Sequence, residues 1–420
     1  VLPDLLFHSY LQKNSLRELP HSIFKGLFNL RNVDLSNNRL VGLPWFIFND
    51  LTNLTTIYLQ KNSLRELPHS IFKGLFNLRN VKMDTFSLCC YVNVSLKEVA
   101  CQFPKEAKDA FSGCNRMIHH QSLRISIWLL GLLAVLGNLA VIAWRMIRRE
   151  DHPIQSCLLT NLALSDFLMG VYLMIISIQD QILSGNYFSY DRKWRSGELC
   201  RFAGALSVLS SEVSVLMLTV ITAERLISIV FALKISRLTL RGAYRICSAV
   251  WIFGVAIAIV PKFDFPYFCN KDREYGYYGR SSVCLPLQLS SERLAGWEYS
   301  VAIFIILNLA AFLFILAAYI FIILTVFKSQ RRITSNGESN TSLNRESTLA
   351  RRVFAIILTD FSCWVPVVIL SILALFGKFK DPDGTVYVWF AVFVLPINSS
   401  VNPVLYTFST PKVLVKHPQS

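Results

Sequence analysis

Seven long apolar stretches occupy the chain beyond residue 122. They cover residues 123–147, 154–178, 200–229, 243–262, 297–327, 349–376 and 386–408. Each has about the 20 residues, or more, that a helix needs to cross about 30 Å of hydrocarbon. Hydrophobic residues make up 53 % of the chain and charged residues only 16 %. These features predict an integral membrane protein with seven spanning helices.

The charges between these stretches predict which side of the membrane each loop faces. Basic residues gather after the first, third, fifth and seventh stretches, among them Arg145, Arg148, Lys234, Arg331 and Arg352. The other three loops balance basic and acidic residues. Because cytoplasmic loops carry the excess of Lys and Arg, the N-terminal end is expected outside the cell. The polar run 335–347 is then expected to be a flexible third cytoplasmic loop.

A repeat with a period of 24 residues fills the N-terminal end. Residues 11–33 recur unchanged at 59–81, and residues 35–57 follow the same pattern. The pattern is that of the leucine-rich repeat, in which each unit is a short strand buried against the next. A helical array is excluded because Pro20, Pro44 and Pro68 recur inside the would-be helices. Residues 1–84 are therefore predicted to be an extracellular β-strand solenoid.

Residues 85–122 are predicted to form a cysteine-containing cap, or hinge, on this solenoid. Four cysteines gather there: Cys89, Cys90, Cys101 and Cys114. Disulfides would close the exposed end of the repeats, although spacing leaves the pairing open. The triplets at Asn53 and Asn93 are glycosylation acceptors if this side is outside.

The two ends of the chain complete the predicted domain organisation. The chain begins at Val1, within the repeat pattern and without a basic and apolar leader. An extracellular N-terminal domain normally follows a signal peptide, so the sequence is expected to be a piece of a longer protein. Residues 123–408 are predicted to be the seven-helix domain and residues 409–420 a truncated cytoplasmic tail.

Polar and constraining residues fall inside the apolar stretches, where burying them is costly and therefore usually functional. In chain order they are Gly137-Asn138, Leu162-Ala163-Leu164-Ser165-Asp166, Glu224-Arg225-Leu226, Trp251, Cys363-Trp364-Val365-Pro366 and Asn402-Pro403-Val404-Leu405-Tyr406. Over residues 123–411 this series resembles the rhodopsin-like family of G-protein-coupled receptors. The resemblance implies a set of switch and G-protein-coupling residues: Glu224, Arg225, Glu346, Asp360, Trp364, Pro366, Asn402, Pro403 and Tyr406.

Several cysteines lie within the apolar stretches and in the loops between them. Cys200 precedes Arg225 by 25 residues, about 37 Å of helix, so the two residues lie at opposite ends of one helix. Cys200 is therefore expected at the outer end, where Cys269 and Cys284 compete as its disulfide partner. Three further cysteines are expected to be buried as small hydrophobic residues: Cys157, Cys247 and Cys363.

Several stretches narrow the resemblance to the relaxin receptor branch of the leucine-rich-repeat-containing receptors. They are Ser211-Glu-Val-Ser-Val215, Val283-Cys284-Leu-Pro286, Tyr299-Ser-Val-Ala-Ile-Phe304, Asn308-Leu-Ala-Ala-Phe312, Thr359-Asp360 and Leu395-Pro-Ile-Asn398. In that branch the cysteine of the Val-Cys-Leu-Pro context pairs with the helix-three cysteine. The resemblance therefore implies a Cys200–Cys284 disulfide, a relaxin- or insulin-like peptide hormone, and signalling through cyclic AMP.

The chain departs from that branch in its ectodomain. It lacks the cysteine-rich low-density-lipoprotein class A module and has only about three and a half repeats. The candidate ligand-binding residues, taken from outward strand positions, do not form an acidic ladder: Asp34, Ser36, Tyr58, Gln60 and Asp84. An invertebrate relative with an orphan or different peptide ligand is the alternative.

The carboxylate of Asp166 has two interpretations. It can be a structural or protonated acid held by neighbouring helices. It can also be the centre of a sodium-linked switch, since a hard cation prefers oxygen ligands. The second interpretation places it in one pocket with further polar or aromatic side chains: Ser214, Trp364, Asn398, Ser399 and Asn402. Sodium is the only cofactor or metal that the sequence suggests.

Arg225 and Glu346 are expected at the same cytoplasmic depth. Glu346 precedes Pro366 by 20 residues, about 30 Å along the sixth helix. The pair is either a latch of the inactive state or a hydrated surface pair, worth about 0–1 kcal/mol. Glu224 is a second possible partner of Arg225.

Three more residues are expected to shape the helices. Pro366 and Pro403 each remove a backbone hydrogen bond and either weaken the helix locally or only kink it. Asp360, in the middle of the sixth helix, needs a partner such as Asn398 or Asn402, and is interpreted as a conformational constraint.

Other functional classes fit less well. The net charge of +15 is spread over loops and repeats, without the aromatic interleaving of a nucleic-acid surface. His119 and His120 have no metal-site spacing, no catalytic or nucleotide-binding motif is present, and no inverted repeat suggests a transporter. The expected function is a multi-pass plasma-membrane receptor that passes a peptide or protein hormone signal to a heterotrimeric G protein. The alternative is a leucine-rich-repeat adhesion or orphan receptor.

Overall fold

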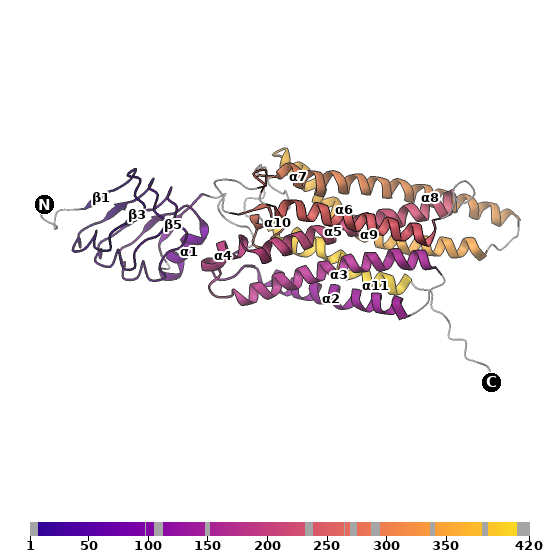
Figure 1. The fold of residues 1–420 in the computed structure, drawn as a ribbon, viewed down its shortest axis with the longest axis horizontal. Coiled ribbons are helices and arrows are strands. Elements are labelled where there is room, and N and C mark those ends of the chain that lie inside the picture. Colours follow the sequence, from indigo (N-terminus) through magenta and orange to yellow (C-terminus); the bar gives the residue numbers. More distant parts are fainter. Residues whose placement is uncertain are drawn as a thin grey trace, which may run out of the picture. The chain divides into compact units, whose positions relative to one another are not determined.

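The computed structural model describes residues 7–96, 98–104, 112–147, 152–231, 238–263, 265–268, 275–286, 295–336, 341–379 and 385–409. Within these ranges the side chains of residues 93–95, 329–336, 341–356, 360, 385, 387 and 405–409 are not described. The chain forms two compact units (Figure 1). The first is Val1–His119 with Asp180–Trp194, and the second is His120–Gln179 with Arg195–Ser420.

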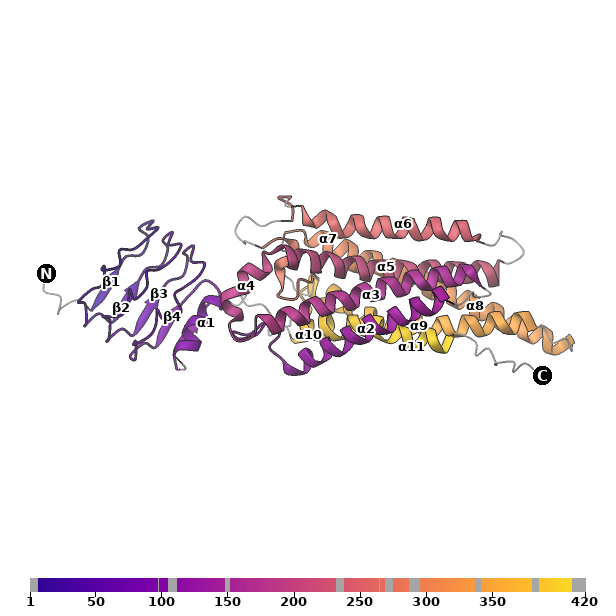
Figure 2. The ribbon, with the colours of Figure 1, turned by 60° about the horizontal axis from the view of Figure 1, so that its bottom comes forward.

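The first unit contains a sheet of five parallel strands. In order they are β1 (His8–Tyr10), β2 (Asn32–Asp34), β3 (Thr56–Tyr58), β4 (Asn80–Lys82) and β5 (Ala100–Gln102). Figure 2 shows β1 to β4 side by side. Val33 of β2 pairs in register with Ile57 of β3, and Ile57 with Val81 of β4, each a full period along the chain. This register buries all three side chains and confirms the predicted solenoid.

Two asparagines stabilise the turns of the repeats. The Oδ1 atom of Asn38 accepts hydrogen bonds of 3.0 Å from the backbone amides of Asn14 and Leu16. Its Nδ2 atom donates to the carbonyl of Leu11 at 2.8 Å. Asn62 repeats this arrangement one period later, donating to the carbonyl of Leu35 at 2.9 Å. These side chains satisfy backbone groups that strands of three residues leave unpaired.

The cap consists of helix α1 (Phe86–Ser95), strand β5 and the segment that follows, up to His119. Helix α1 begins after Thr85, whose side chain accepts a hydrogen bond from the amide of Leu88. One disulfide joins Cys89 to Cys101, and a second joins Cys90 to Cys114. The cap thus closes the last repeat with both an added strand and two covalent links.

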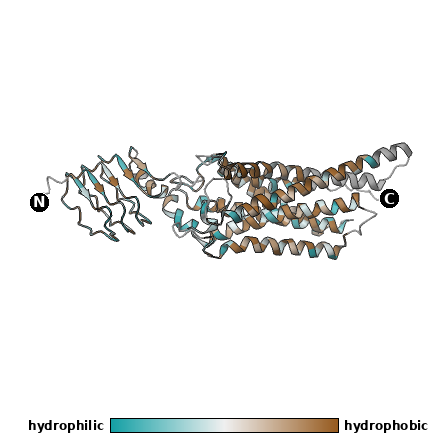
Figure 3. Ribbon diagram, turned by 90° about the horizontal axis from the view of Figure 1, so that it is seen from above, coloured by the Kyte–Doolittle hydropathy of each residue, from teal (hydrophilic) through white to brown (hydrophobic). Residues whose placement is uncertain are grey.

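The second unit is a helical bundle. Its helices are α2 (Gln121–Ile147), α3 (Pro153–Ile182), α5 (Glu198–Val230), α6 (Leu240–Ile259) with η3 (Val260–Lys262), α7 (Trp297–Val301) with η5 (Ala302–Leu307) and α8 (Asn308–Asn336), α9 (Thr341–Leu375), and α10 (Thr385–Trp389) with η6 (Phe390–Val394) and α11 (Leu395–Ser409). Six of these runs are long and apolar enough to cross a membrane, and the seventh is apolar over Phe390–Val404. Figure 3 shows hydrophobic residues along them.

The helices correspond to the seven predicted stretches, with one correction between the fifth and the sixth. Residues 335–347 were expected to form a flexible loop, but α8 continues to Asn336 and α9 begins at Thr341. Only residues 337–340 of that run lie outside the described part of the chain. The physical reason is local composition, because Leu, Arg, Glu and Ala after residue 341 favour a helix.

Candidate functional site

The carboxylate of Asp166 joins three helices at the centre of the bundle. Asp166 is fully buried in α3. Its Oδ1 atom accepts hydrogen bonds from the hydroxyls of Ser214 in α5, at 3.2 Å, and Ser399 in α11, at 2.9 Å. Its Oδ2 atom accepts one from Nδ2 of Asn402 in α11, at 2.7 Å. Three donors therefore surround one buried acid.

A fourth helix joins this network through Asn138 of α2. Its Nδ2 atom donates to the carbonyl of Ser399 at 3.0 Å and to that of Ala134 at 2.9 Å. Beside it, a Cβ at Gly137 would lie 2.9 Å from the ring of Pro403, so only glycine allows this approach of α2 and α11. The motifs of the first, second and seventh helices thus meet at one place, together with Ser214 of the third helix.

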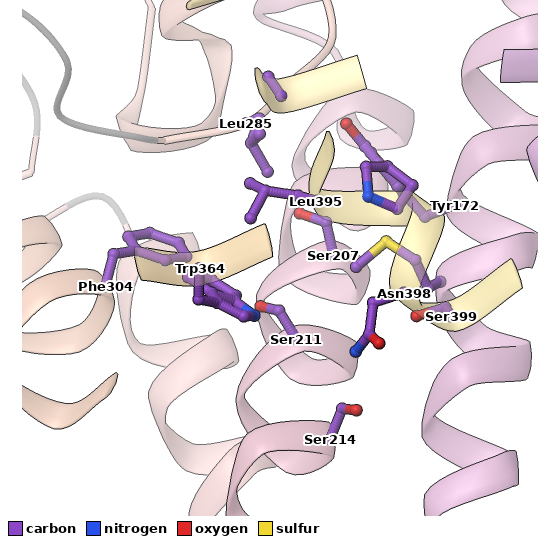
Figure 4. Close-up of a pocket in the computed structure, with 13 residues that line it drawn as sticks. Tyr172, Ser207, Ser211, Ser214, Leu285, Phe304, Trp364, Leu395, Asn398 and Ser399 are labelled. Atoms are coloured by element: carbon purple, nitrogen blue, oxygen red, sulfur yellow. The ribbon is translucent and has the colours of Figure 1, made fainter. Parts of the chain in front are cut away.

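A small cavity lies beside the Asp166 network (Figure 4). Its volume is about 30 Å³, and its lining includes Tyr172, Ser207, Ser211, Ser214, Leu285, Phe304, Trp364, Asn398 and Ser399. This is room for about two water molecules. The Asp166 carboxylate and the hydroxyls of Ser214 and Ser399 supply oxygen atoms, the ligands that a sodium ion prefers, whereas Asn402 presents its amide nitrogen to the carboxylate. The residues present therefore fit the predicted ion, which stays a prediction.

Near its C-terminal end, α5 carries Arg225 and Glu224, the second partner predicted for this arginine. Arg225 is buried, and its Nε atom lies 3.1 Å from Oε2 of Glu224. Oε1 of Glu224 accepts a hydrogen bond of 2.9 Å from the Ser228 hydroxyl. Glu224 thus lies within ion-pair distance of Arg225. The side chain of Glu346 lies outside the described residues, so the latch with Arg225 stays a prediction.

The structure describes the side chains of some of the other predicted switch residues but not of all of them. Trp364 is buried in α9, and Pro366 and Pro403 lie inside α9 and α11. The side chains of Asp360 and Tyr406 lie outside the described residues.

The second outer loop is anchored to α5. Cys200 and Cys284 form a disulfide with their Cα atoms 5.5 Å apart, the pairing that the family resemblance implied. The rival Cys269 lies outside the described residues. Tyr278 donates to the carbonyl of Ala258, and burial raises the pKa of its hydroxyl well above the usual value. The loop is therefore a packed part of the bundle.

The strand face of the repeats differs from the predicted ligand face. Asp34 and Tyr58 are adjacent and half-exposed, and the Lys82 ammonium lies 5.4 Å from the Tyr58 ring centroid. Ser36, by contrast, is buried, which corrects its assignment as an outward position. Strand β2 ends at Asp34, so the in–out alternation of a strand does not extend to residue 36.

Two further residues of that face have structural contacts. The Asp84 carboxylate accepts hydrogen bonds from the amides of Lys61, at 2.6 Å, and Asn62, at 3.0 Å. Gln60 is half-buried, with its Oε1 atom enclosed. Asp34 and Tyr58 are therefore the stronger candidates for ligand contacts. Of the glycosylation candidates, Asn53 is exposed and Asn93 lies in α1 with its side chain undescribed.

A buried polar pair was missed as a site by the sequence interpretation. Glu212 of α5 is fully buried and accepts a hydrogen bond of 3.2 Å from Nδ2 of Asn308, which begins α8 after the π-helical turn η5. The sequence analysis names both residues only within the stretches that resemble the relaxin receptor branch, without a functional role. A charged residue in the middle of an apolar span was the signal that could have revealed it.

Comparisons with known proteins agree with this architecture. The profile of the 7 transmembrane receptor (rhodopsin family) matches residues 137–406, and that of the leucine rich repeat matches residues 28–85. The crystal structure of squid rhodopsin aligns with a TM-score of 0.54 at 21 % identity, covering 69 % of this chain and 77 % of rhodopsin. That likeness shows the seven-helix fold.

Curated relatives narrow the position within the family. G-protein coupled receptor GRL101 of Lymnaea stagnalis is 44 % identical over 78 % of this chain and 28 % of its own length. Human relaxin receptor 2 is 36 % identical over 72 % of this chain and 39 % of its own length. The chain thus spans less than half the length of these relatives. It belongs to the rhodopsin-like family of seven-transmembrane receptors, which are multi-pass membrane proteins and not enzymes, and to the members of that family that carry leucine-rich repeats.

Proposed function

We propose that the protein is a plasma-membrane receptor that passes an extracellular hormone signal to a heterotrimeric G protein and modulates cyclic AMP. A peptide of the relaxin and insulin type is the favoured ligand, as the names of the relaxin receptor relatives suggest. The N-terminus is outside the cell and the C-terminus inside. The observation that carries the proposal is the Asp166 network, which joins α2, α3, α5 and α11.

The network offers a two-state element of the kind that a receptor needs. Its hydrogen bonds hold α11 and α5 against α3, so a movement of α11 away from α3 must break the bonds from Ser399 and Asn402. A ligand that favours the opened arrangement shifts the population toward it. Pro403 lies inside α11 directly after Asn402 and cannot donate a backbone hydrogen bond, which makes bending of the helix easier there.

The size of the bundle cavity supports an extracellular binding site. Pockets for drug-sized molecules measure about 300–1,000 Å³. The cavity beside Asp166, within the described part of the bundle, measures about 30 Å³. This cavity is therefore too small for a peptide hormone, and the hormone is proposed to bind the repeats and outer loops.

The strand face of the repeats carries charged and aromatic side chains, which supports a ligand that has both charged and apolar groups. Asp34 supplies a negative charge, Lys82 a positive charge, and Tyr58 an aromatic surface between them. Tyr10 extends this row on the other side of Asp34 and is exposed. We expect a cationic side chain of the hormone opposite Asp34 and an apolar or aromatic one against the tyrosines.

The test is a cell assay with a panel of insulin- and relaxin-like peptides. We expect at least one peptide to change cyclic AMP in cells that express the receptor, and Asp34→Lys to weaken its potency about tenfold or more. Glu18→Lys makes the same charge reversal at an exposed position away from the strands and serves as the control. An adhesion or orphan receptor would be favoured if no peptide acts and if Arg225, Asn402 and Tyr406 can be replaced without loss of signalling.

A further inference from the structure

The repeats over residues 7–84 are basic, with ten Lys and Arg against five Asp and Glu. Half of these cations lie in the turns that directly follow strands β1, β2 and β3. These turns are residues 11–18, 35–42 and 59–66, and we call this side of the solenoid the post-strand flank. Its cations are all exposed: Lys13, Arg17, Arg39, Lys61 and Arg65.

Backbone hydrogen bonds stack the three turns of the flank in register. The amide of Val41 donates to the carbonyl of Arg17, and the amide of Arg65 to that of Val41, each at 3.4 Å. Neighbouring strands of such a stack lie about 4.8 Å apart, so the backbones of Arg17 and Arg65 are separated by about 10 Å. Lys13 and Lys61, also two repeats apart, form a second row. The cations thus follow the axis of the solenoid in parallel rows.

The acids near the flank neutralise only part of this charge. Glu18 and Glu66 are exposed and follow Arg17 and Arg65 directly in the chain. The carboxylate of Asp84 instead accepts hydrogen bonds from two backbone amides of the third turn, at 2.6 and 3.0 Å. Five cations therefore stand against two exposed acids. This excess of positive charge attracts an anionic partner.

The middle repeat adds exposed apolar side chains beside these rows. Val41, between Arg17 and Arg65, is 49 % exposed. Four residues further along the chain, Trp45 is 59 % and Phe46 57 % exposed, with ring centroids 6.4 Å apart. Phe46 has a φ of +62°, which is uncommon for a residue other than glycine. The two repeats on either side have His and Ser at the positions of these rings.

Rows of cations beside exposed rings fit a ligand that carries many anionic groups on a chain of sugar rings. Sulfate groups accept charge-assisted hydrogen bonds from Lys and Arg, and the apolar face of a sugar ring packs on an aromatic side chain. Clusters of Lys and Arg are typical of surfaces that bind heparin. We propose that the post-strand flank, together with Trp45 and Phe46, binds a sulfated polysaccharide of the heparan type.

This inference rests on the extracellular position of the repeats in the proposed function, because sulfated polysaccharides lie outside the cell. An anionic membrane surface is the competing partner for a basic surface with exposed rings. Anionic lipids gather in the cytoplasmic leaflet, on the other side of the membrane from the proposed position of the repeats. The polysaccharide is therefore favoured, and the membrane is an outcome of the test.

Binding of heparin to the full chain in nanodiscs of phosphatidylcholine tests the proposal at physiological ionic strength, where only nearby charges interact strongly. The flank variant removes four charges: Lys13→Gln, Arg17→Gln, Lys61→Gln and Arg65→Gln. The control variant removes four exposed charges from other sides of the same two repeats: Lys25→Gln, Arg31→Gln, Lys73→Gln and Arg79→Gln. We expect the Kd for heparin to rise at least about tenfold in the flank variant and to stay within about threefold of wild type in the control.

Trp45→Ala separates the contribution of the rings from that of charge. We expect its Kd for heparin to rise at least about threefold with an unchanged dependence on salt, because the ring carries no charge. Phe28→Ala is the matched control, since Phe28 is a ring of similar exposure, 54 %, in the turn that precedes β2. Equal affinities of these two variants would overturn the role given to the rings.

A smaller change keeps the test decisive if the flank variant does not fold, as judged by its thermal unfolding. Arg17→Gln combined with Arg65→Gln should raise the Kd at least about threefold, and Lys25→Gln combined with Lys73→Gln should not. The proposal is overturned if wild type does not bind heparin, or if flank and control variants lose affinity equally. It is also overturned if the flank changes weaken binding to phosphatidylserine vesicles and leave heparin binding intact.

Heparin binding and signalling are measured separately, so the two proposals can fail independently. If heparin binds through the flank while no peptide alters cyclic AMP, the polysaccharide site stands and the proposed function fails. If a peptide alters cyclic AMP while wild type does not bind heparin, the proposed function stands and the polysaccharide site is abandoned.

Discussion

Asn402 donates a hydrogen bond of 2.7 Å to Oδ2 of Asp166, across 236 positions of the chain. It links α11 to α3 at a point where both side chains are fully buried. A hydrogen bond to a charged group contributes about 1.5–3 kcal/mol, and loss of one partner leaves the other buried and unsatisfied. This contact is therefore expected to hold the two helices together until a ligand or an ion changes the balance.

Sodium is expected to stabilise the receptor through Asp166. In purified receptor, the thermal unfolding midpoint should be higher in sodium chloride than in choline chloride at equal ionic strength. An ion that binds only the folded state adds about 1.4 kcal/mol when present at about ten times its Kd. Asp166→Asn should remove the difference, while Glu18→Gln, on the exposed surface of the repeats, should retain it. Equal midpoints for wild type in the two salts would leave Asp166 a purely structural residue.

Breaking the predicted latch should raise ligand-free signalling. In the proposed activation the cytoplasmic end of the sixth helix moves outward, so an attraction between Arg225 and Glu346 would exist only in the closed state. A bias of about 1.4 kcal/mol changes the active population about tenfold. Glu346→Ala should therefore increase basal cyclic AMP signalling at equal surface expression, whereas Arg225→Ala should abolish coupling.

The structure also supplies the competing explanation for that experiment. Oε2 of Glu224 lies 3.1 Å from Nε of Arg225, so this neighbour could hold the arginine without Glu346. Unchanged basal activity in Glu346→Ala, together with a rise in Glu224→Gln, would assign the restraint to Glu224. The latch between helices would then have to be abandoned.

The pairing of Cys200 with Cys284 can be checked by chemistry. Peptide mapping of non-reduced protein should recover the two cysteines in one linked peptide. Replacing either residue should lower surface expression, because each is fully buried and the loop packs on α5. Recovery of Cys200 linked to Cys269 would show that the other pairing forms in the cell.

The orientation of the chain follows from loop charge and is also testable. An epitope inserted after Asn340 should stain only in permeabilised cells, because the basic loops are expected in the cytoplasm. An epitope at the N-terminal end of the repeats should stain in intact cells. Staining of the Asn340 epitope in intact cells would reverse the assignment.

Much of the fold could be predicted because it depends on periodicity. The period of the repeats sets the register of Val33, Ile57 and Val81, and the apolar runs are long enough to fix the helices. The motif residues Asp166 and Asn402 were likewise predicted to meet. The sodium interpretation also placed Ser214 and Ser399, the other hydrogen-bond partners of Asp166, in the same pocket. The bond from Asn138 to the Ser399 carbonyl was not predicted, because contacts between distant helices depend on packing that one sequence does not display.

Two local features could not be predicted for identifiable reasons. Ser36 follows a strand of only three residues. Extending the in–out alternation of that strand to residue 36 wrongly predicted that the Ser36 side chain faces outward. Helix α4 (Tyr187–Arg195) is polar and short, and its Phe188 contacts His69, Tyr91 and Cys114. The sequence analysis assigned this helix to the bundle because it lies between two spanning helices in the chain. Chain order does not reveal that a segment packs in the other unit.

The central claim, that this chain activates a G protein, is tested most directly by guanine-nucleotide exchange in nanodiscs with purified heterotrimeric G proteins. The receptor, or its Glu346→Ala variant if basal exchange is low, should accelerate nucleotide exchange at least several-fold over empty nanodiscs. The Arg225→Ala variant, folded as judged by its thermal unfolding, should return the rate to that of empty nanodiscs. Exchange no faster than with empty nanodiscs for every variant and peptide, or equal rates with and without Arg225, would contradict the account.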